Sequence, residues 1–371
     1  LKDPYCLNNL GMFVDNSRIV SYHQFDILSG TWIVEFQTGN QAITYLDELG
    51  TYIWKFYPLV QEELDVKYEP NDPFYESGDQ WHLDNYGQNN GTSGIDLNTQ
   101  GAWNEFTGDG IVIGVVDDGI DYNNPDISPN FLSAYSYDYC GNKTDVMPSN
   151  SSDEGIVDWH GTAVAGIVSA KGDNDLGITG VAYNSSMVGL RLIADDCTFD
   201  YTLDEAEAYA LNHRLDLIDI YTNSWGPVDS GEVLGDAGPL AIAALEKGVT
   251  DGREGLGTIY TWANGNGLDN RDQSNKDNYA NSRYTISVGA VDWQGEQTWY
   301  SETGSNLLVS APSFNYEGDP SVFTTDVSGS DGDNDTVYTP NMGGTSAATP
   351  MVAGVVALML EANQNLTWRD V

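Results

Sequence analysis

Short apolar runs alternate with amphipathic or small-residue stretches along most of the chain after residue 80. The runs that are typical of buried strands lie at 111–116, 187–193, 217–221, 258–263, 285–290 and 307–311. Helical patterns occur at 161–170 and 203–211, and another follows Ser346. Strands that alternate with helices predict an α/β fold, in which helices cover both faces of a mostly parallel sheet.

The first 70 residues have a different pattern. They predict a strand at 31–36, a short amphipathic helix at 40–50 and a second strand at 52–57. Residues 70–80 are rich in turn formers and predict a linker. We therefore expect a small α+β domain over residues 1–70, followed by a large α/β domain over residues 71–371.

Acidic residues dominate the charge of this chain. Its 371 residues include 56 Asp and Glu but only 14 Lys and Arg, which gives a formal net charge of −42. That excess opposes binding to nucleic-acid phosphates or anionic lipids, and it suits a salty exterior or basic ligands. The longest apolar run, near 351–360, is interrupted by Gly354. It is shorter than the ~20 residues of a membrane span.

Three cysteines, Cys6, Cys140 and Cys197, allow at most one disulfide, for which Cys140 and Cys197 are one candidate pair. None of the three lies close enough to another in sequence to form a typical metal-ligand pair. The chain begins with Leu1 and stops in what looks like the start of a helix, so we treat it as a fragment at both ends.

Three junctions between predicted strands and helices carry reactive side chains. Asp117, followed by Asp118 and a glycine, ends the first buried strand, and His160 begins a helix of small residues. Ser346 stands at the start of the last helix, where free backbone N–H groups and the helix dipole would stabilise an oxyanion. Taken alone, each has an ordinary explanation: a turn-forming Asp, a helix-capping His and a Ser cap.

The three junctions together favour nucleophilic catalysis. A reactive serine needs a base and a carboxylate that orients the base, and Asp, His, Ser is one chain order in which such a triad occurs. Asn266 lies between glycines after a predicted strand, where its amide can donate to a developing oxyanion. A left-handed turn would explain Asn266 alone, but it explains less well the presence of all four residues.

These motifs resemble those of the subtilisin-like serine endopeptidases and, within them, the kexin/furin-like proprotein convertases. The resemblance covers about residues 72–371, and Ser-Trp-Gly-Pro at 224–227 together with Trp-Tyr-Ser-Glu at 299–302 indicates the convertase-like branch. The other segments that carry it are 110–121, 124–126, 160–162, 180–184, 262–267 and 344–350.

The resemblance implies roles for individual residues. The implied catalytic residues are Asp117, His160 and Ser346, with Asn266 as the oxyanion donor. The implied substrate-binding residues are Asp229 and Asp277 at the S1 pocket, which holds the side chain before the scissile bond, Asp118 at S2, and Glu207 and Tyr279 at S4. A buried negative pocket favours Arg or Lys. In a chain with 56 acids some fall at such positions by chance, an explanation that is strongest for Glu207.

Calcium is the cofactor that the resemblance implies. Hard cations prefer clustered oxygen ligands. The implied ligands form two groups, namely Asp229, Asp272 and Glu302 beside S1, and Asp126, Asn174 and Asp72 with backbone carbonyls from the loop after residue 170.

This chain departs from the family pattern near the histidine. The acid that is usual three residues before it is replaced by Val157, with Asp158 next to it, and the cysteine that is usual four residues after it is replaced by Val164. The acidic S4 loop near 235–236 does not align cleanly. A requirement for a second basic residue in the substrate therefore stays open.

Residues 1–70 resemble the propeptide of such enzymes and are expected to act as an intramolecular inhibitor, although no dibasic site precedes residue 81. A β-rich P domain is expected beyond residue 371. We thus expect an extracellular or cell-surface, monomeric, calcium-dependent serine endopeptidase that cleaves polypeptides after Arg or Lys. The alternatives are a broad-specificity degradative subtilase and a catalytically inactive binding homologue.

Overall fold

The computed structural model describes residues 19–24, 32–36, 68–151, 156–316, 318–329 and 332–371. The chain divides into two units, Leu1–Val66 and Lys67–Val371. In the first unit, the described residues form an antiparallel pair of strands, β1 (Ile19–Gln24) and β2 (Trp32–Phe36). β2 matches the strand predicted at 31–36, whereas β1 was not predicted. The helix predicted at 40–50 and the strand predicted at 52–57 lie outside the described residues.

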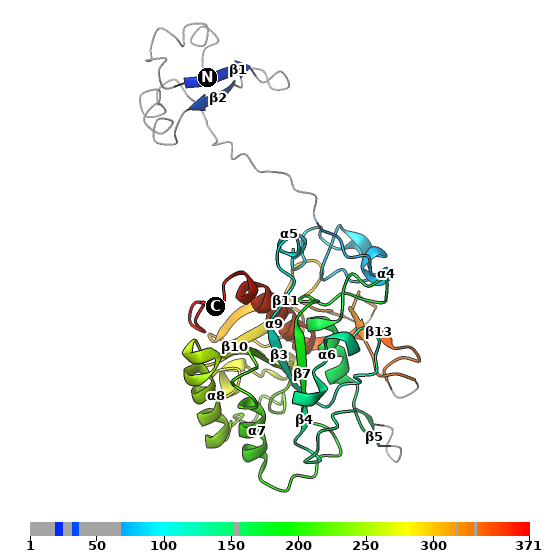
Figure 1. The fold of residues 1–371 in the computed structure, drawn as a ribbon, viewed down its shortest axis with the longest axis vertical. Helices are drawn as coiled ribbons and strands as arrows, with labels where there is room; N and C mark the ends of the chain where they lie inside the picture. Colours follow the sequence, from blue (N-terminus) through cyan, green and yellow to red (C-terminus); the bar gives the residue numbers. More distant parts are fainter. Residues whose placement is uncertain (1–18, 25–31, 37–67, 152–155, 317, 330–331) are drawn as a thin grey trace. The chain divides into compact units, whose positions relative to one another are not determined.

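The second unit is built on a seven-stranded sheet in which every neighbouring pair is parallel (Figure 1). The strand order is β11-β10-β9-β8-β3-β7-β4. The strands are β3 (Val112–Asp117), β4 (Tyr137–Asp138), β7 (Ser186–Arg191), β8 (Ile220–Asn223), β9 (Ile259–Ala263), β10 (Ile286–Val291) and β11 (Leu307–Pro312). The predicted parallel sheet is confirmed, and only the two-residue β4 gave no signal in the sequence.

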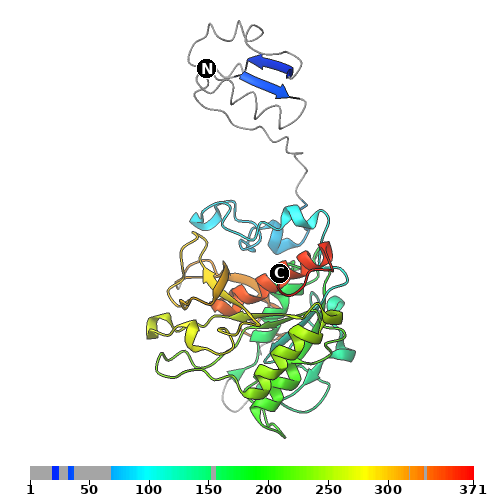
Figure 2. The same ribbon diagram turned by 90° about the vertical axis from the view of Figure 1, so that its left-hand side faces the viewer.

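Helices cover both faces of this sheet (Figures 1 and 2). The helices are α6 (His160–Ser169) and α9 (Gly344–Ala362) on one face, and α7 (Leu203–Leu211) and α8 (Pro239–Asp251) on the other. Successive strand residues point to opposite faces, so Ile113 and Val115 of β3 enter the core under α6 and α9, and Val116 enters the other core. α8 was not predicted, although Pro239 at its first turn is a typical helix start.

Smaller elements complete the second unit. They are the helices α4 (Pro73–Glu76) and α5 (Gln100–Trp103), and the antiparallel pairs β5 (Asn150–Ser151) with β6 (Ile156–Val157) and β12 (Val322–Thr325) with β13 (Tyr338–Met342). β13 ends at Met342, just before α9, so the β12–β13 pair fixes the entry of the chain into that helix.

Among the described residues, α9 is the one helix long and apolar enough to cross a membrane by length and composition. It has 19 residues and is therefore longer than the apolar run at 351–360 that the sequence analysis considered. In the structure, 72% of its most apolar window is buried inside the protein. This is the burial expected of a core helix.

The parallel sheet brings chemistry-bearing residues to one edge. β3 ends at Asp117, and the segments after β8 and β9 contain Ser224 and Asn266. α6 begins with His160. α9 begins with Gly344, two residues before Ser346. The carboxyl ends of parallel strands form the usual position of functional groups in such sheets.

Candidate active site

Asp117 and His160 form the first part of the site. Asp117 is the last residue of β3, His160 is the first residue of α6, and Nδ1 of the imidazole lies 2.8 Å from Oδ1 of the carboxylate. Only 1% of Asp117 is exposed. A carboxylate bound to Nδ1 orients the ring and stabilises the imidazolium that forms when Nε2 takes a proton. The structure thus joins the predicted base to its predicted orienting acid.

Charges around His160 change its basicity. Burial opposes the charged imidazolium, but the charge of Asp117, its hydrogen bond and the charge of Asp118 outweigh burial and raise the pKa of His160 to about 9. Burial and then repulsion from Asp117 raise the pKa of Asp118. The imidazole is therefore a stronger base than an ordinary histidine.

Asp118 holds the start of α6. Its carboxylate accepts hydrogen bonds from the backbone N–H of His160 at 3.0 Å and of Gly161 at 2.7 Å. A Cβ at position 161 would lie 2.3 Å from the carbonyl oxygen of Gly119, so only glycine permits this close approach. The role of Asp118 at S2 stays a prediction, and in this structure both of its carboxylate oxygens bind the helix.

Ser346 reaches the same place through the neighbouring strand. The register of β3 and β8 pairs Val116 with Asn223, and Asp117 and Ser224 directly follow these paired residues. Ser224 Oγ donates to the carbonyl of Ser346 at 3.0 Å, and Ser346 Oγ donates to the carbonyl of Ser224 at 3.2 Å. These bonds bring Ser346 to the edge that holds the Asp117–His160 pair. In this conformation its hydroxyl binds the carbonyl and not the imidazole.

Asn266 is fixed against the residue that precedes Ser346. Its Oδ1 accepts hydrogen bonds from the N–H and the hydroxyl of Thr345, at 2.9 and 3.1 Å. Because Oδ1 faces these donors, the amide N–H₂ points away from them. Asn266 and Ser346 line the same pocket. Gly344, with φ +71°, gives the backbone a turn that side chains disfavour. That the Asn266 amide donates to an oxyanion stays a prediction.

A pocket of about 250 Å³ opens beside Ser346 and Asn266. The segments after β8 and β9 form its walls together with the loop 272–277. Its charged lining consists of Asp229, Asp272, Asp277, Glu302 and Lys276. We call the four acids the pocket carboxylates.

The pocket carboxylates repel one another. Burial, followed by repulsion from Asp229 and Asp272, raises the pKa of Asp277 to about 6. Burial is also the main cause that raises the pKa of Glu302 to about 8 and that raises the pKa of Asp229. A cation in the pocket would relieve this repulsion, and so the pocket favours positively charged ligands.

Comparison with known proteins decides the family. The model of the subtilase family (Peptidase S8) matches residues 108–371. This chain belongs to the subtilase family. It is 41% identical to neuroendocrine convertase 2 of Homo sapiens over 314 residues, which are 83% of this chain and 46% of that protein. It is also 41% identical to the human proprotein convertase subtilisin/kexin type 6 over 302 residues, 81% of this chain and 29% of that protein.

Solved structures show the same fold. The serine protease of Aeromonas sobria superposes with a TM-score of 0.71 and 26% identity, covering 84% of this subtilase and 60% of that chain. A protease of Pseudoalteromonas arctica gives a TM-score of 0.63 with 27% identity, covering 82% and 90%. The subtilisin-like fold and the likeness to proprotein convertases are therefore confirmed, and the chain spans less than half the length of its convertase relatives.

The residues predicted at S4 lie behind the pocket of this subtilase. Tyr279 donates a hydrogen bond to Glu207 of α7 at 2.9 Å, and both residues are buried. The Tyr279 ring packs against Trp225, which lines the pocket. The structure thus brings the two residues together, and their contact with substrate stays a prediction.

Three of the pocket carboxylates surround one glycine. A Cβ on Gly267 would lie 2.8 and 2.9 Å from the Cβ atoms of Asp272 and Asp229, and 2.9 Å from Oε1 of Glu302. The three acids, which we call the cradle, are therefore neighbours, and carboxylate oxygens are the ligands that calcium prefers. In the described part of the chain, no three or more His, Cys, Asp or Glu side chains are placed so that they could hold a metal ion. Calcium there would also need backbone and water oxygens.

The second predicted calcium group also converges. Asn174 donates to Asp126 at 3.1 Å, and the backbone N–H groups of Asp173 and Asn174 donate to Asp72 at 2.8 and 3.4 Å. Burial is the first cause that raises the pKa of Asp72 to about 6, and the charges of Asp126 and Asp173 add to it. The structure brings the three residues together, but their side-chain oxygens accept hydrogen bonds from N–H and O–H donors here, so their binding of calcium stays a prediction.

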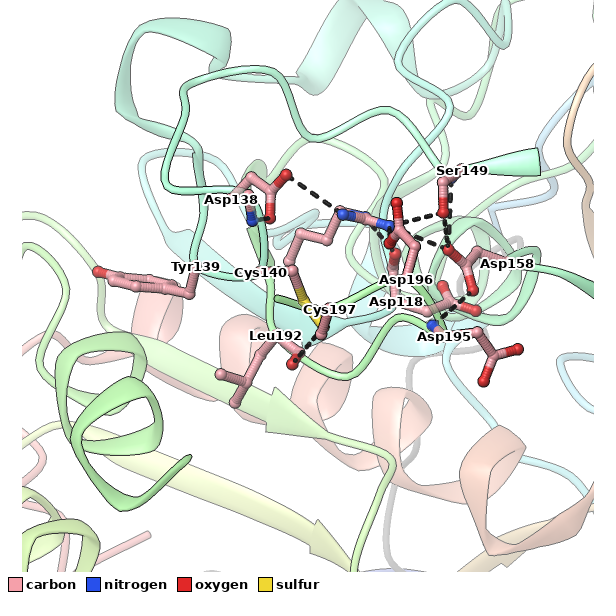
Figure 3. The surroundings of a disulfide bond; sticks show 12 residues. Asp118, Asp138, Tyr139, Cys140, Ser149, Asp158, Leu192, Asp195, Asp196 and Cys197 are labelled. Atoms are coloured by element: carbon pink, nitrogen blue, oxygen red, sulfur yellow. Dashed lines mark hydrogen bonds and ion pairs between the residues drawn. A yellow bond between two sulfur atoms is a disulfide. The ribbon is translucent and has the colours of Figure 1, made fainter. Parts of the chain in front are cut away.

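A charged cluster that the sequence analysis missed lies beneath the Asp117–His160 pair. Arg191, only 2% exposed, donates from Nε to the carbonyl of Asp118 at 2.9 Å. Its other nitrogens bind the side chains of Asp138, Asp158, Asp196 and Ser149. Figure 3 shows these partners around the disulfide, which joins Cys140 to Cys197 as anticipated in the sequence analysis. We call these residues the Arg191 cluster.

The Arg191 cluster left one signal in the sequence. Arg191 is the single charged residue in the apolar run 187–193, and a buried charge requires partners. Asp158 is one of them, so the acid nearest to His160 in sequence is bound to Arg191.

Proposed function

We propose that this subtilase is a calcium-dependent serine endopeptidase that cleaves polypeptides after Arg or Lys. The pocket beside Ser346 carries the proposal, because its lining holds four carboxylates and one ammonium group. A basic side chain is transferred from water into a protein only where opposite charges pair with it. Asp277 and Asp229 are the acids that we assign to this pairing.

The geometry suits acyl transfer. Ser346 Oγ leaves the Ser224 carbonyl by rotation about its Cα–Cβ bond and attacks the carbonyl carbon of the scissile peptide, while Nε2 of His160 takes its proton. Asp117 stabilises the imidazolium. The oxyanion receives hydrogen bonds from the Asn266 amide and from backbone N–H groups at the start of α9. His160 then protonates the leaving amine, and water hydrolyses the acyl-enzyme by the same steps.

Calcium fits the cradle of Asp229, Asp272 and Glu302. When bound, it supplies positive charge that neutralises these acids and holds the loops that carry them. Asp277 then pairs with the substrate from outside the cradle, and Asp229 serves both cations. The second group, at Asp72, Asp126 and Asn174, would hold calcium away from the pocket and stabilise the loop after α6.

A peptide panel tests this proposal. The peptides differ only in the residue before the scissile bond, calcium is present, and Ser346→Ala is the control for contaminating proteases. We expect strong preference for Arg and Lys. Equal cleavage after Leu and Phe would replace the proposal with a broad-specificity degradative subtilase. No cleavage, together with no labelling of Ser346 by a serine-directed phosphonate, would indicate an inactive binding homologue.

The biological setting follows from the same proposal. We infer an extracellular or cell-surface monomer that acts on basic polypeptides and does not bind nucleic acid, consistent with the net charge of −42. Residues 1–70 would inhibit the enzyme in cis until they are removed. Active enzyme whose N-terminal sequence still begins at residue 1 would contradict that role.

A further inference from the structure

Lys276 is the one cationic side chain among the described residues that line the pocket. Its Nζ lies 3.7 Å from Oδ1 of Asp272. It also donates to the carbonyl oxygens of Gly231 at 3.3 Å and of Arg271 at 3.4 Å. The ammonium group therefore joins the loop after β8 to the loop that carries Asp272 and Asp277.

The charges of the pocket indicate why a lysine is useful there. Four carboxylates and Lys276 leave a formal charge of −3 in the pocket. One Ca²⁺ would reduce this to −1, which matches a single Arg or Lys of the substrate. Without Lys276, one negative charge would stay unpaired after both cations are bound.

We propose that Lys276 is a built-in cation that limits how tightly the cradle of Asp229, Asp272 and Glu302 holds calcium, and that it sets the pocket charge to fit one basic side chain. The inference rests on the proposed calcium dependence. Lys276 and Ca²⁺ both use Asp272, so the metal must displace or repel the ammonium group. In this partly exposed site, repulsion between a single and a double charge a few ångströms apart changes binding by about tenfold, or about 1.4 kcal/mol.

Calcium titration calorimetry tests the inference without relying on activity. The full chain carries Ser346→Ala to prevent self-digestion, and Lys276→Gln and Lys276→Arg are compared in that background. Lys247→Gln is the matched control, because Lys247 forms another Lys–Asp pair four residues apart, on the exposed surface of α8. Asp272→Asn identifies which binding step belongs to the cradle.

We expect Lys276→Gln to bind calcium at the cradle about tenfold more tightly, and Lys276→Arg and Lys247→Gln to resemble the parent. If Lys276 only tethers the two loops, Lys276→Gln will weaken calcium binding, and this result or no change overturns the inference while the calcium proposal stands. If neither the parent nor any variant binds calcium, both are overturned.

Kinetics give a second readout. With Ser346 intact and calcium saturating, the extra negative charge in Lys276→Gln should lower KM for an Arg peptide about threefold to tenfold and leave kcat unchanged, because the charge acts on binding in the ground state. An unchanged KM would contradict the assigned control of pocket charge.

Discussion

Two groups of acids lie near Asp117, His160 and Ser346, and they differ in how their charge is compensated. In the Arg191 cluster, one guanidinium binds three carboxylates. Burial raises the pKa of Asp196, but the hydrogen bond and the charge of Arg191, with hydrogen bonds from Ser149 and the backbone, together hold it below its ordinary value. Among the pocket carboxylates, burial and mutual repulsion raise the pKa of Asp277 and Glu302. The compensated group belongs to the scaffold, whereas the pocket carboxylates, which have only Lys276 as a counter-charge among the described residues of the pocket, would gain from binding further cations.

The largest effect should come from removing the compensating charge. Arg191→Met leaves buried carboxylates without a partner and should lower the free energy of unfolding by about 3–5 kcal/mol. Chemical denaturation measures the change. Lys143→Met is the control, because Lys143 also approaches Asp138, at 3.7 Å, but is 55% exposed. It should cost no more than about 1 kcal/mol, and equal losses in both variants would refute the contrast.

In the pocket, loss of a charge should affect substrate binding and not stability. Asp277→Asn should lower kcat/KM for an Arg peptide by roughly 100-fold, which corresponds to about 2.7 kcal/mol. The kcat/KM for a Leu peptide should stay nearly unchanged. The melting temperature should stay or rise, because the raised pKa shows that the carboxylate is unfavourable in the folded protein. Glu246→Gln, an exposed acid on α8, is the control. A parallel loss for both peptides would assign Asp277 a structural role.

Removal of calcium should affect the pocket carboxylates and leave the Arg191 cluster unchanged. Chelation should abolish activity and lower the free energy of unfolding by about 1.4 kcal/mol, for calcium that was tenfold above its Kd. Thermal unfolding with and without the chelator measures this. In Glu302→Gln, the part of the chelation-induced loss of stability that comes from the cradle should disappear. The Arg191 cluster should not respond to the chelator, because the guanidinium of Arg191 is its cation. Full activity after exhaustive chelation would refute the calcium proposal.

Some of this contrast could be predicted from the sequence. The alternation of apolar runs predicted the sheet, and strand ends and helix starts predicted the positions of Asp117, His160 and Ser346. Arg191 was visible as a charge in an apolar strand. Its partners come from β4 at Asp138 and from loops at Asp158 and Asp196, and their meeting depends on the three-dimensional path of the chain.

The pocket shows a similar limit. Motif context predicted its acids, yet the Lys276–Asp272 pair forms in a loop where four-residue spacing has no regular meaning. The bond between Glu207 and Tyr279 requires α7 to pack beside the loop after β9, and no local pattern encodes that packing. Local signals therefore predicted elements and reactive residues, whereas charge compensation needed the tertiary structure.

The smallest expected effect concerns protons at His160. Because Asp117 and Asp118 raise its pKa above the ordinary 6.5, kcat/KM should fall about tenfold per pH unit on the acidic limb, with a midpoint above 6.5. Asp118→Asn removes one of these charges and should move the midpoint down by less than about one unit. Asp121→Asn, whose charge is not among those acting on His160, should not move it.

The contribution of His160 to stability changes with pH in the opposite direction to kcat/KM. A raised histidine pKa contributes stability that is complete below the pKa of the unfolded chain and is lost as pH rises through the pKa of the folded protein. Activity should therefore increase over the pH range in which the Asp117–His160 pair loses its stabilising charge. If activity and this part of the stability rise together with pH, or if Asp118→Asn moves the midpoint up, the assignment of His160 as the base in the Asp117–His160 pair is wrong.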